Sequence, residues 1–221
     1  MNSIEYLEWD SIFFNKKIGR LICDDSIGSP SDLDKKDFNL IYVFSRNKLN
    51  TNWQPYFLDQ KTNSTLTYET STPIQDNNLF EISEKKRAIE LKKLISINGH
   101  YSRFYLDKNL NHKYEELYQI WGKKCFNFNT NRTWYYVKNN ELVGFITIDI
   151  SNNNQVELCS VLPQYRGQGI AKKLWLHAFN EIAMDGPTEF HISFQNENTI
   201  AKNLYKSLGF KSYQNWYIYH I

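Results

Sequence analysis

The sequence predicts a mixed α and β protein, and three observations support this fold class. Hydrophobic residues make up 41% and aromatic residues 16% of the 221 residues, which is enough to build a buried core. Residues 133–150 hold two runs of β-branched and aromatic residues around a short polar turn, a pattern typical of a β-hairpin. Residues 156–182 hold a strand pattern, a glycine loop and a helix pattern in that order. We expect a smaller N-terminal α/β part at residues 1–80 and a larger unit at residues 81–221.

The first 80 residues show short strand patterns and no strong helix pattern. Apolar and β-branched residues predict strands at residues 18–23, 39–44 and 64–69, the last of which alternates polar and apolar side chains. Residues 70–78 are polar and contain several turn-forming residues. We place the boundary between the two parts near this segment.

Two helices and the hairpin open the larger unit. A helix is expected to begin at Ser83 and to end at Asn98-Gly99, a common C-terminal stop. A second helix is expected at residues 112–125, where apolar residues recur at spacings of three, four and seven. The hairpin strands are expected at residues 133–137 and 142–150. The apolar faces of the two helices consist of Ala88, Leu91, Leu94 and Ile95, and of Tyr114, Leu117, Tyr118, Trp121 and Cys125.

The most informative segment is the glycine loop between a strand at residues 156–162 and a helix that begins at Ile170. The loop reads Gln164-Tyr165-Arg166-Gly167-Gln168-Gly169. Its two glycines permit backbone torsions barred to other residues, and the first N–H groups of the following helix lack internal partners. An anion such as a pyrophosphate satisfies both, and Arg166 can add a charge-assisted hydrogen bond.

Other phosphate loops do not fit this segment. The sequence lacks the GxxxxGK[ST] pattern of nucleoside triphosphatases, and Lys172 stands where a dinucleotide-binding loop needs its third glycine. An ordinary strand-to-helix connection remains the alternative interpretation of the loop taken alone.

A second motif follows about forty residues later. A strand is expected at residues 189–194, then a short helix from Asn198 that ends at Leu208-Gly209-Phe210. Gln164, Gly167 and Gly169, taken with Asn198, Ala201, Leu204-Tyr205 and Gly209-Phe210, resemble the acyl-CoA-binding core of the GCN5-related N-acetyltransferase (GNAT) superfamily. The resemblance covers about residues 83–221. It implies the GNAT fold, a central twisted and mostly antiparallel sheet flanked by helices.

The resemblance also implies site residues. Acyl-CoA would be the co-substrate, with its pyrophosphate on the loop and its pantetheine arm along the strand before it. A main-chain N–H between Leu158 and Val161 would contact the oxyanion. Tyr205 would protonate the departing thiolate, although a buried aromatic role is the alternative. Ala171 stands where a third glycine is frequent, which leaves the loop usable. The expected acyl-CoA-binding residues are Leu158, Val161, Gln164, Tyr165, Arg166, Gly167, Gln168, Gly169, Ile170, Ala171 and Asn198.

The front of the chain carries a shorter resemblance. Residues 7–14, LEWDSIFF, followed by Ile18-Gly19-Arg20-Leu21, look like the opening of sugar-nucleotide N-acyltransferases similar to TDP-fucosamine acetyltransferase. Such enzymes acylate an amino-dideoxy sugar linked to dTDP for surface polysaccharide biosynthesis, with acetyl-CoA or a longer acyl-CoA such as hydroxybutyryl-CoA. The alternative is that the aromatic residues of this segment only fill the core of the front half.

Two further side chains on the strand before the glycine loop, Glu157 and Cys159, could take part in catalysis. Amide formation from a thioester needs a neutral amine, so a base is required unless water carries the proton. Glu157 is the candidate general base, because alternation along the strand puts it on one face with Cys159 and Val161. An exposed glutamate at a sheet edge is the alternative. Cys159 lacks a supporting histidine and is expected to be inert packing.

Composition excludes several function classes. The formal net charge of +2 gives little support to nucleic-acid or acidic-membrane binding. The longest apolar run, at residues 142–150, is about half of the ~20 residues of a membrane helix, and the N-terminus lacks a signal-peptide pattern. Three isolated cysteines and scattered histidines predict neither disulfides nor a metal site. We expect a cytoplasmic enzyme of small molecules, and the resemblance allows a homodimer.

The acceptor site is less defined. We expect it on the other side of the sheet opening from acyl-CoA, with contributions from both parts of the chain. Tyr101, Phe104 and Tyr105 could stack on a thymine ring and Arg103 could meet its diphosphate, or the run could pack as a helix end. Two alternatives to a sugar nucleotide stay open. They are acetylation of a protein N-terminus, peptide or polyamine, and a CoA-binding module without turnover.

Overall fold

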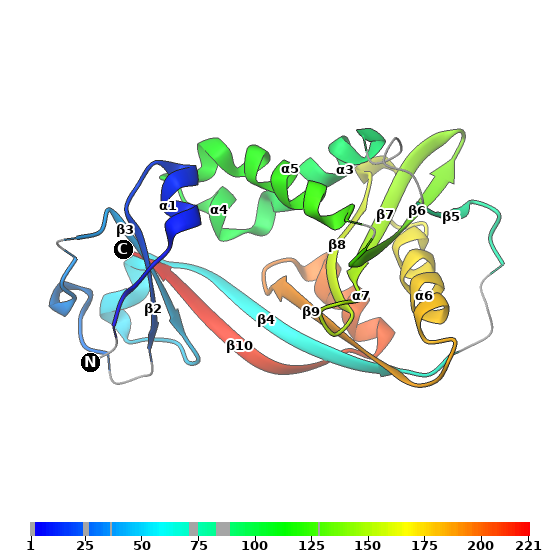
Figure 1. The fold of residues 1–221 in the computed structure, drawn as a ribbon. Coiled ribbons are helices and arrows are strands. Elements are labelled where there is room, and N and C mark those ends of the chain that lie inside the picture. The colour runs from blue at the N-terminus through cyan, green and yellow to red at the C-terminus, as the bar shows by residue number, and fades with distance from the viewer. Residues whose placement is uncertain (1–2, 24–26, 36, 71–74, 83–88, 128) are drawn as a thin grey trace.

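The computed structural model describes residues 3–23, 27–35, 37–70, 75–82, 89–127 and 129–221. These residues form a ten-stranded sheet in the order β1-β2-β3-β10-β4-β9-β8-β7-β6-β5. Neighbouring strands are antiparallel except in the pairs β2–β3 and β8–β9. Helices flank the sheet (Figure 1). The predicted fold class, a twisted and mostly antiparallel sheet with helices, is confirmed.

The front of the chain contains more structure than its sequence indicates. Its elements are β1 (Glu5–Tyr6), α1 (Glu8–Phe14), β2 (Ile18–Cys23), β3 (Leu40–Ser45) and β4 (Phe57–Tyr68), with 3-10 turns at Pro30–Asp32 and Thr51–Tyr56. The short helix α1 was not predicted, and Asn15 ends it with a left-handed φ of 51°. The expected strand at residues 64–69 begins earlier, because the polar residues before it also pair in the sheet.

The larger unit follows the predicted order of elements. It contains β5 (Leu79–Glu81), α3 (Lys92–Ser96), α4 (Arg103–Leu106), α5 (Tyr114–Cys125), β6 (Asn131–Lys138), β7 (Glu141–Asp149), β8 (Gln155–Val161), α6 (Ile170–Ile182), β9 (Thr188–Gln195), α7 (Thr199–Leu208) and β10 (Lys211–His220). Further 3-10 turns lie at Ile89–Leu91, Gly99–Tyr101, Asn111–Lys113 and Pro163–Tyr165.

The helix predicted to begin at Ser83 is only partly described. Residues 83–88, which include Ala88 of its expected apolar face, lie outside the described residues. The part that the structure describes is a 3-10 turn followed by the five-residue helix α3. Leu91, Leu94 and Ile95 are buried, as the apolar face predicts.

The hairpin of β6 and β7 is confirmed. Asn139 and Asn140 form its two-residue turn with φ values of 53° and 60°, and asparagine tolerates this left-handed conformation better than most residues. Helix α5 packs on one face of β7 and β8, while α6 packs on the other (Figure 1). Trp175 and Phe179 of α6 are fully buried against this sheet.

Strand β4 joins the two parts of the chain. It lies between β10 and β9 and pairs with both along most of its length, for example Lys61 with Gln195 and with Trp216. The sheet therefore contains strands from both sides of the predicted boundary near residue 80. The division of the chain into two parts stays a prediction. Residues of β4 alternate between the two faces of the sheet, so one strand serves both.

The sheet is open between β8 and β9. These parallel strands pair through one register position, Gln155 with His191, and then diverge. On its other edge β8 carries a β-bulge, because Thr147 pairs with Leu158 and Ile148 with Val156, which leaves Glu157 as an extra residue. The opening and the bulge place the loop-side strand at a gap where both faces of the sheet can be reached.

Candidate functional site

The glycine loop has the geometry that an anion site requires. Gly167 and Gly169 have φ values of 76° and 75°, in the left-handed region. Gly169 is also the N-cap of α6, and no side chain caps the helix there. A Cβ at either glycine would meet nothing within 4 Å, so backbone torsion rather than lack of space calls for glycine. The first N–H groups of α6 lack partners within the helix, as in any helix without a side-chain cap.

A cavity of about 280 Å³ connects this loop with β8 and α7. Its lining includes Tyr205 and eight of the eleven predicted acyl-CoA-binding residues, namely Val161, Tyr165, Arg166, Gly167, Gly169, Ile170, Ala171 and Asn198. Asn198 caps α7 by accepting a hydrogen bond from the Ala201 N–H at 3.1 Å. Arg166 donates from Nε to the Val161 carbonyl at 3.0 Å, which ties the loop to the end of β8.

Three predicted acyl-CoA-binding residues do not line this cavity. Gln168 accepts a hydrogen bond from Lys138 Nζ at 2.5 Å on the outer side of the loop. Gln164 is exposed in the turn before it. Leu158 pairs with Thr147, whose hydroxyl donates to the Cys125 carbonyl of α5, so Leu158 belongs to the α5 face of the sheet.

The cavity also contains residues that the sequence analysis missed. Ile97, Asn98 and Tyr101 reach it from the segment between α3 and α4. Nothing in their local sequence marks them, because their position depends on how this segment folds over the loop. Ala201 and Leu204 complete the wall on α7; they belong to the second motif and could have been included with Asn198.

Tyr205 stands at the inner wall of the cavity. Its ring packs against Trp175, Phe194 and Phe210, with centroid distances of 5.2, 5.1 and 6.1 Å. Burial, and then the neighbouring Cys159, raise the pKa of Tyr205 well above its ordinary value. The phenol is therefore neutral, as a proton donor must be.

Cys159 faces the same side as Tyr205. Its sulfur accepts a hydrogen bond from Trp175 Nε1 at 3.1 Å, and burial raises the pKa of the thiol to about 12. A thiol that stays protonated is a poor nucleophile, which agrees with the predicted packing role.

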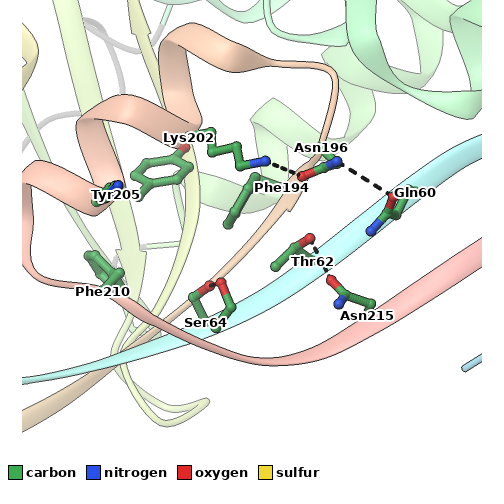
Figure 2. Close-up of a pocket in the computed structure, with 11 residues that line it drawn as sticks. Gln60, Thr62, Ser64, Phe194, Asn196, Lys202, Tyr205, Phe210 and Asn215 are labelled. Atoms are coloured by element: carbon green, nitrogen blue, oxygen red, sulfur yellow. Dashed lines mark hydrogen bonds between the residues drawn. The ribbon is translucent and has the colours of Figure 1, made fainter.

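Tyr205 also borders a second cavity, of about 390 Å³, beneath α7 (Figure 2). Figure 2 shows Thr62 and Ser64 of β4 below the level of the Tyr205 ring. Lys202, Asn196 and Gln60 are linked by hydrogen bonds along the upper side of the cavity in this view. Lys202 donates to Asn196 at 2.8 Å, and Thr62 donates to Asn215 at 2.8 Å. The polar groups of this cavity are thus largely paired with one another.

Glu157 lies on the opposite face of the sheet from Tyr205. The prediction that it shares a face with Cys159 and Val161 is wrong, because the β-bulge at Glu157 interrupts the alternation of side chains. Glu157 is exposed and lines a cavity of about 560 Å³ with Trp121, Lys124 and Asp149. Desolvation, and then the charge of Asp149, raise the pKa of Glu157.

This cavity continues into another of about 380 Å³, and the two share Trp121 and Lys124 of α5. We call the combined hollow the α5 groove. Residues from before and after position 80 contribute to its lining. The second cavity is lined by Trp9, Asp10, Asp59, Lys61, Ser102, Arg103, Phe104, Tyr118, Trp121, Lys124, Gln195 and Ile218.

Charged groups from both parts gather along the α5 groove. Desolvation raises the pKa of Asp59 to about 7 and also raises that of Asp10. Desolvation, and then Arg103, lower the pKa of Lys61. Glu157 and Lys61 each favour the charged form of the other, so they lie close enough to interact.

The run from Tyr101 to Tyr105 divides among three places. Arg103 and Phe104 line the α5 groove, and Tyr101 lines the cavity beside the glycine loop. Tyr105 packs on His100 and Tyr114, with centroid distances of 5.0 and 4.9 Å. Of the three aromatic residues, Phe104 alone lines the α5 groove, and it is buried.

Comparison with known proteins decides the family. Residues 111–217 match the family model of the Acetyltransferase (GNAT) domain, which spans the glycine loop, α7 and Tyr205. The chain contains a GNAT acetyltransferase domain. The predicted superfamily and the predicted enzyme class, an acyl-CoA-dependent N-acyltransferase, are confirmed. No curated protein matches the sequence, so the resemblance of the front half to sugar-nucleotide N-acyltransferases stays a prediction.

Solved structures agree with the GNAT fold. A functionally unknown conserved protein from Staphylococcus epidermidis is 12% identical, with a TM-score of 0.65, over 98% of this chain and 89% of its own. A GCN5-related N-acetyltransferase from Sphaerobacter thermophilus is 13% identical, with a TM-score of 0.54, over 82% of this chain and 59% of its own. A GNAT-family protein from Novosphingobium aromaticivorans is 14% identical, with a TM-score of 0.51, over 82% and 73%. At these identities the likeness concerns the fold.

Two further findings bear on the predicted class of molecule. Within the described part of the chain, no helix is long and apolar enough to cross a membrane. Among the same residues, no three histidine, cysteine or acidic side chains lie together in a group that could hold a metal ion.

Proposed function

We propose that the GNAT domain transfers an acyl group from acyl-CoA to the amine of a dTDP-linked amino-dideoxy sugar by direct attack. The acyl group would be acetyl or a longer one such as hydroxybutyryl. One observation carries the proposal: β8, the strand that diverges from β9, lines the loop cavity with Cys159, Ser160 and Val161 and lines the α5 groove with Glu157. Two substrates that bind in these hollows would approach β8 from opposite sides.

Acyl-CoA is assigned to the loop cavity. The free N–H groups at the start of α6 and the guanidinium of Arg166 would bind its pyrophosphate, since a helix N-terminus favours anions. The diverging edge of β8 leaves main-chain groups unpaired toward β9, where a pantetheine amide could take the place of a neighbouring strand. The residues assigned to it are those eight that line the cavity.

The chemistry then follows from two side chains on opposite faces. Glu157 would accept a proton from the acceptor ammonium, and the raised pKa of its carboxyl makes it a better base. The amine attacks the thioester carbonyl, and a main-chain N–H of β8 near the bulge would stabilise the oxyanion. As the C–S bond breaks, Tyr205 would give its proton to the sulfur. The attacking nitrogen loses its second proton to form the neutral amide, and this proton returns through solvent to the Tyr205 oxygen. No covalent enzyme intermediate is needed.

The acceptor is assigned to the α5 groove. Trp9 is 45% exposed at its rim, and Lys124 lies 6.0 Å from the centre of the Trp9 ring. An indole beside a lysine offers a stacking surface for a nucleobase and a charge for a diphosphate. Lys61 and Arg103 add positive charge further inside.

A second class of acceptor also has support. The α5 groove holds four acidic residues, Asp10, Asp59, Asp149 and Glu157, and these would suit a polyamine or the N-terminus of a peptide. The two candidates make opposite demands, because one carries a diphosphate and the other carries additional cations.

Thiol release from acyl-CoA tests both candidates. The panel contains acetyl-CoA and hydroxybutyryl-CoA, each with dTDP-linked 3-amino and 4-amino dideoxy sugars, a polyamine and a short peptide. We expect turnover with one amino sugar and little with the other acceptors. Turnover with only the polyamine or the peptide would refute the sugar-nucleotide acceptor and leave the acyltransferase assignment intact.

A further inference from the structure

Arg103 presents an unused guanidinium to the α5 groove. Its Nε is buried and has no hydrogen-bond partner among the residues that the structure describes. No described residue forms a hydrogen bond or ion pair with the rest of the guanidinium either, and the guanidinium lies against three aromatic rings. A buried donor without a partner is unfavourable, because it has lost its hydrogen bonds to water and gained none in the protein.

Aromatic packing holds the guanidinium in place. Its carbon lies 4.6 Å from the ring centre of Tyr42, 5.3 Å from that of Phe44 and 4.3 Å from that of Phe104. Aromatic rings attract the cation but accept no conventional hydrogen bond from its N–H groups in the guanidinium plane. Packing thus holds Arg103 in place while its donors stay available to a ligand.

Nearby carboxylates among the described residues do not form ion pairs with Arg103. Asp10 and Asp59 both interact with Arg103 electrostatically, yet neither forms an ion pair with it. The pKa of each carboxyl is raised in spite of the neighbouring cation, because desolvation outweighs the attraction. A ligand group with two acceptor oxygens in the plane of the guanidinium would form the paired, charge-assisted hydrogen bonds that these carboxylates do not form.

The position of Arg103 also fits an acceptor. Arg103 and Lys61 line one half of the α5 groove and Glu157 lines the other half, with Trp121 and Lys124 common to both. A molecule whose amine reaches Glu157 would extend along the groove toward Arg103.

We propose that Arg103 binds an anionic group, a phosphate or a carboxylate, at the far end of the acceptor and thereby selects amines that carry such a group. This inference rests on the proposed assignment of the α5 groove to the acceptor. It narrows the acceptor class, because a polyamine offers no anion to Arg103.

Binding without turnover tests the inference directly. The full chain is titrated calorimetrically with dTDP, and separately with glutamate as a carboxylate-bearing amine. Saturating CoA is present so that the glycine loop is blocked. We expect dTDP to bind the wild type and to bind Arg103→Lys at least about 10-fold more weakly, because lysine cannot form the bidentate contact. Binding of glutamate alone, lost in the variant, would support the inference with carboxylate as the source.

Arg46→Met is the matched control. Arg46 also stacks on an aromatic ring, 3.5 Å from the centre of Trp216, but it is exposed and lies outside the α5 groove. Thermal unfolding of each variant checks the fold, and Arg103→Lys preserves the buried charge. Equal anion affinity in wild type and Arg103→Lys, equal losses in Arg103→Lys and Arg46→Met, or no anion binding by the wild type would each overturn the inference.

The acyl-transfer assay separates this inference from the proposed function. With an anionic acceptor, Arg103→Lys should raise KM about 10-fold and change kcat little, whereas a cationic acceptor should be unaffected. Anion binding at Arg103 without turnover of any dTDP-amino sugar would leave the inference standing and remove the sugar nucleotide. If the amino sugar is turned over and its KM is the same in wild type and Arg103→Lys, the sugar-nucleotide function stands and the inference about Arg103 is refuted.

Discussion

At the scale of single residues, the two candidate catalytic groups differ most in what surrounds them. Tyr205 is enclosed by Trp175, Phe194 and Phe210, whereas Glu157 stands exposed at a bulge on the other face. A neutral phenol in an apolar wall can release a proton only as a strong base forms beside it, and a thiolate leaving from CoA is such a base. The wall also protects the phenol from competing proton transfer to water.

Replacing Tyr205 by Phe should therefore lower kcat by about 100-fold or more and leave acyl-CoA affinity almost unchanged. The ring packing is kept and only the hydroxyl is lost. Stopped-flow thiol release with calorimetric titration of acetyl-CoA measures both quantities. Tyr213→Phe, on the exposed part of β10, is the control. An unchanged chemical step would show that Tyr205 is only a buried aromatic residue.

Glu157 should give the rate its dependence on pH. A base works in its ionised form, so kcat/KM should rise with pH through the pKa of Glu157, which lies above the ordinary glutamate value. Glu157→Gln should lower the rate and flatten this rise. A pH profile of both proteins from pH 5 to 9 makes the comparison. The same limb in the variant would assign the proton transfer to water or to another group.

Asp59 should make the protein less stable as the pH rises. Its pKa is about 7 in the folded state and about 4 in an unfolded chain, so between these values the native state binds more protons. The free energy of unfolding then falls from pH 4 to pH 7. Asp59→Asn should be more stable than the wild type at pH 8 by roughly 2–4 kcal/mol, with a smaller difference at pH 5.

Urea unfolding at both pH values measures the effect of Asp59. Asp185→Asn, at an exposed position, is the control for the loss of a carboxylate. A destabilised Asp59→Asn variant at pH 8 would mean that the carboxylate is held by favourable contacts instead.

At the scale of elements, the glycine loop combines a left-handed backbone with open space. Valine at position 169 would adopt the φ of 75° only with strain of about 1–2 kcal/mol, whereas asparagine tolerates this region. Gly169→Val should weaken CoA binding about 10-fold and leave acceptor affinity nearly intact, and Gly169→Asn should weaken it less. Titrations of both ligands test this. Equal weakening by the two variants would point to side-chain bulk rather than backbone strain.

Periodicity predicts those elements whose neighbours are close in sequence. The hairpin of β6 and β7, the helices α5, α6 and α7, and the glycine loop all follow from local patterns, and the residues that carry the GNAT resemblance lie there. The bulge at Glu157 could not be foreseen, because it depends on the register of β8 against β7. The first half of β4 was not predicted for a similar reason. Its polar residues line cavities on both faces of the sheet, so polar and apolar side chains do not alternate along it.

At the scale of the whole molecule, the α5 groove is a product of the assembled chain. Its lining comes from the helices α1, α4 and α5 and from the strands β4, β6, β7, β8, β9 and β10, so no single segment of the sequence predicts it. The sequence placed an acceptor site between the two parts only in general terms. The Arg103 contact depends on Tyr42 and Phe44 of β3, about sixty residues earlier, and so lies beyond any local pattern.

A chain of residues 81–221 should not fold by itself. Removal of β4 separates β9 from β10, which pair with it on its two edges, and exposes both. We expect this fragment to lack a cooperative thermal transition and to bind CoA poorly, although it holds the whole loop cavity. Circular dichroism and CoA titration, with the full chain as reference, provide the test. A fragment that unfolds cooperatively and binds CoA normally would show that the larger unit is independent.

The placement of β4 also sets an order of events during synthesis. This strand leaves the ribosome early, but its partners β9 and β10 emerge only near the end of the described chain. Until then both of its edges lack their native hydrogen bonds, and a nascent chain with open strand edges is prone to pair wrongly. The many contacts between distant segments further slow the search for the native state. Expression at low temperature or with added chaperones should therefore affect the yield of this protein more than that of a GNAT domain whose strands are adjacent in sequence.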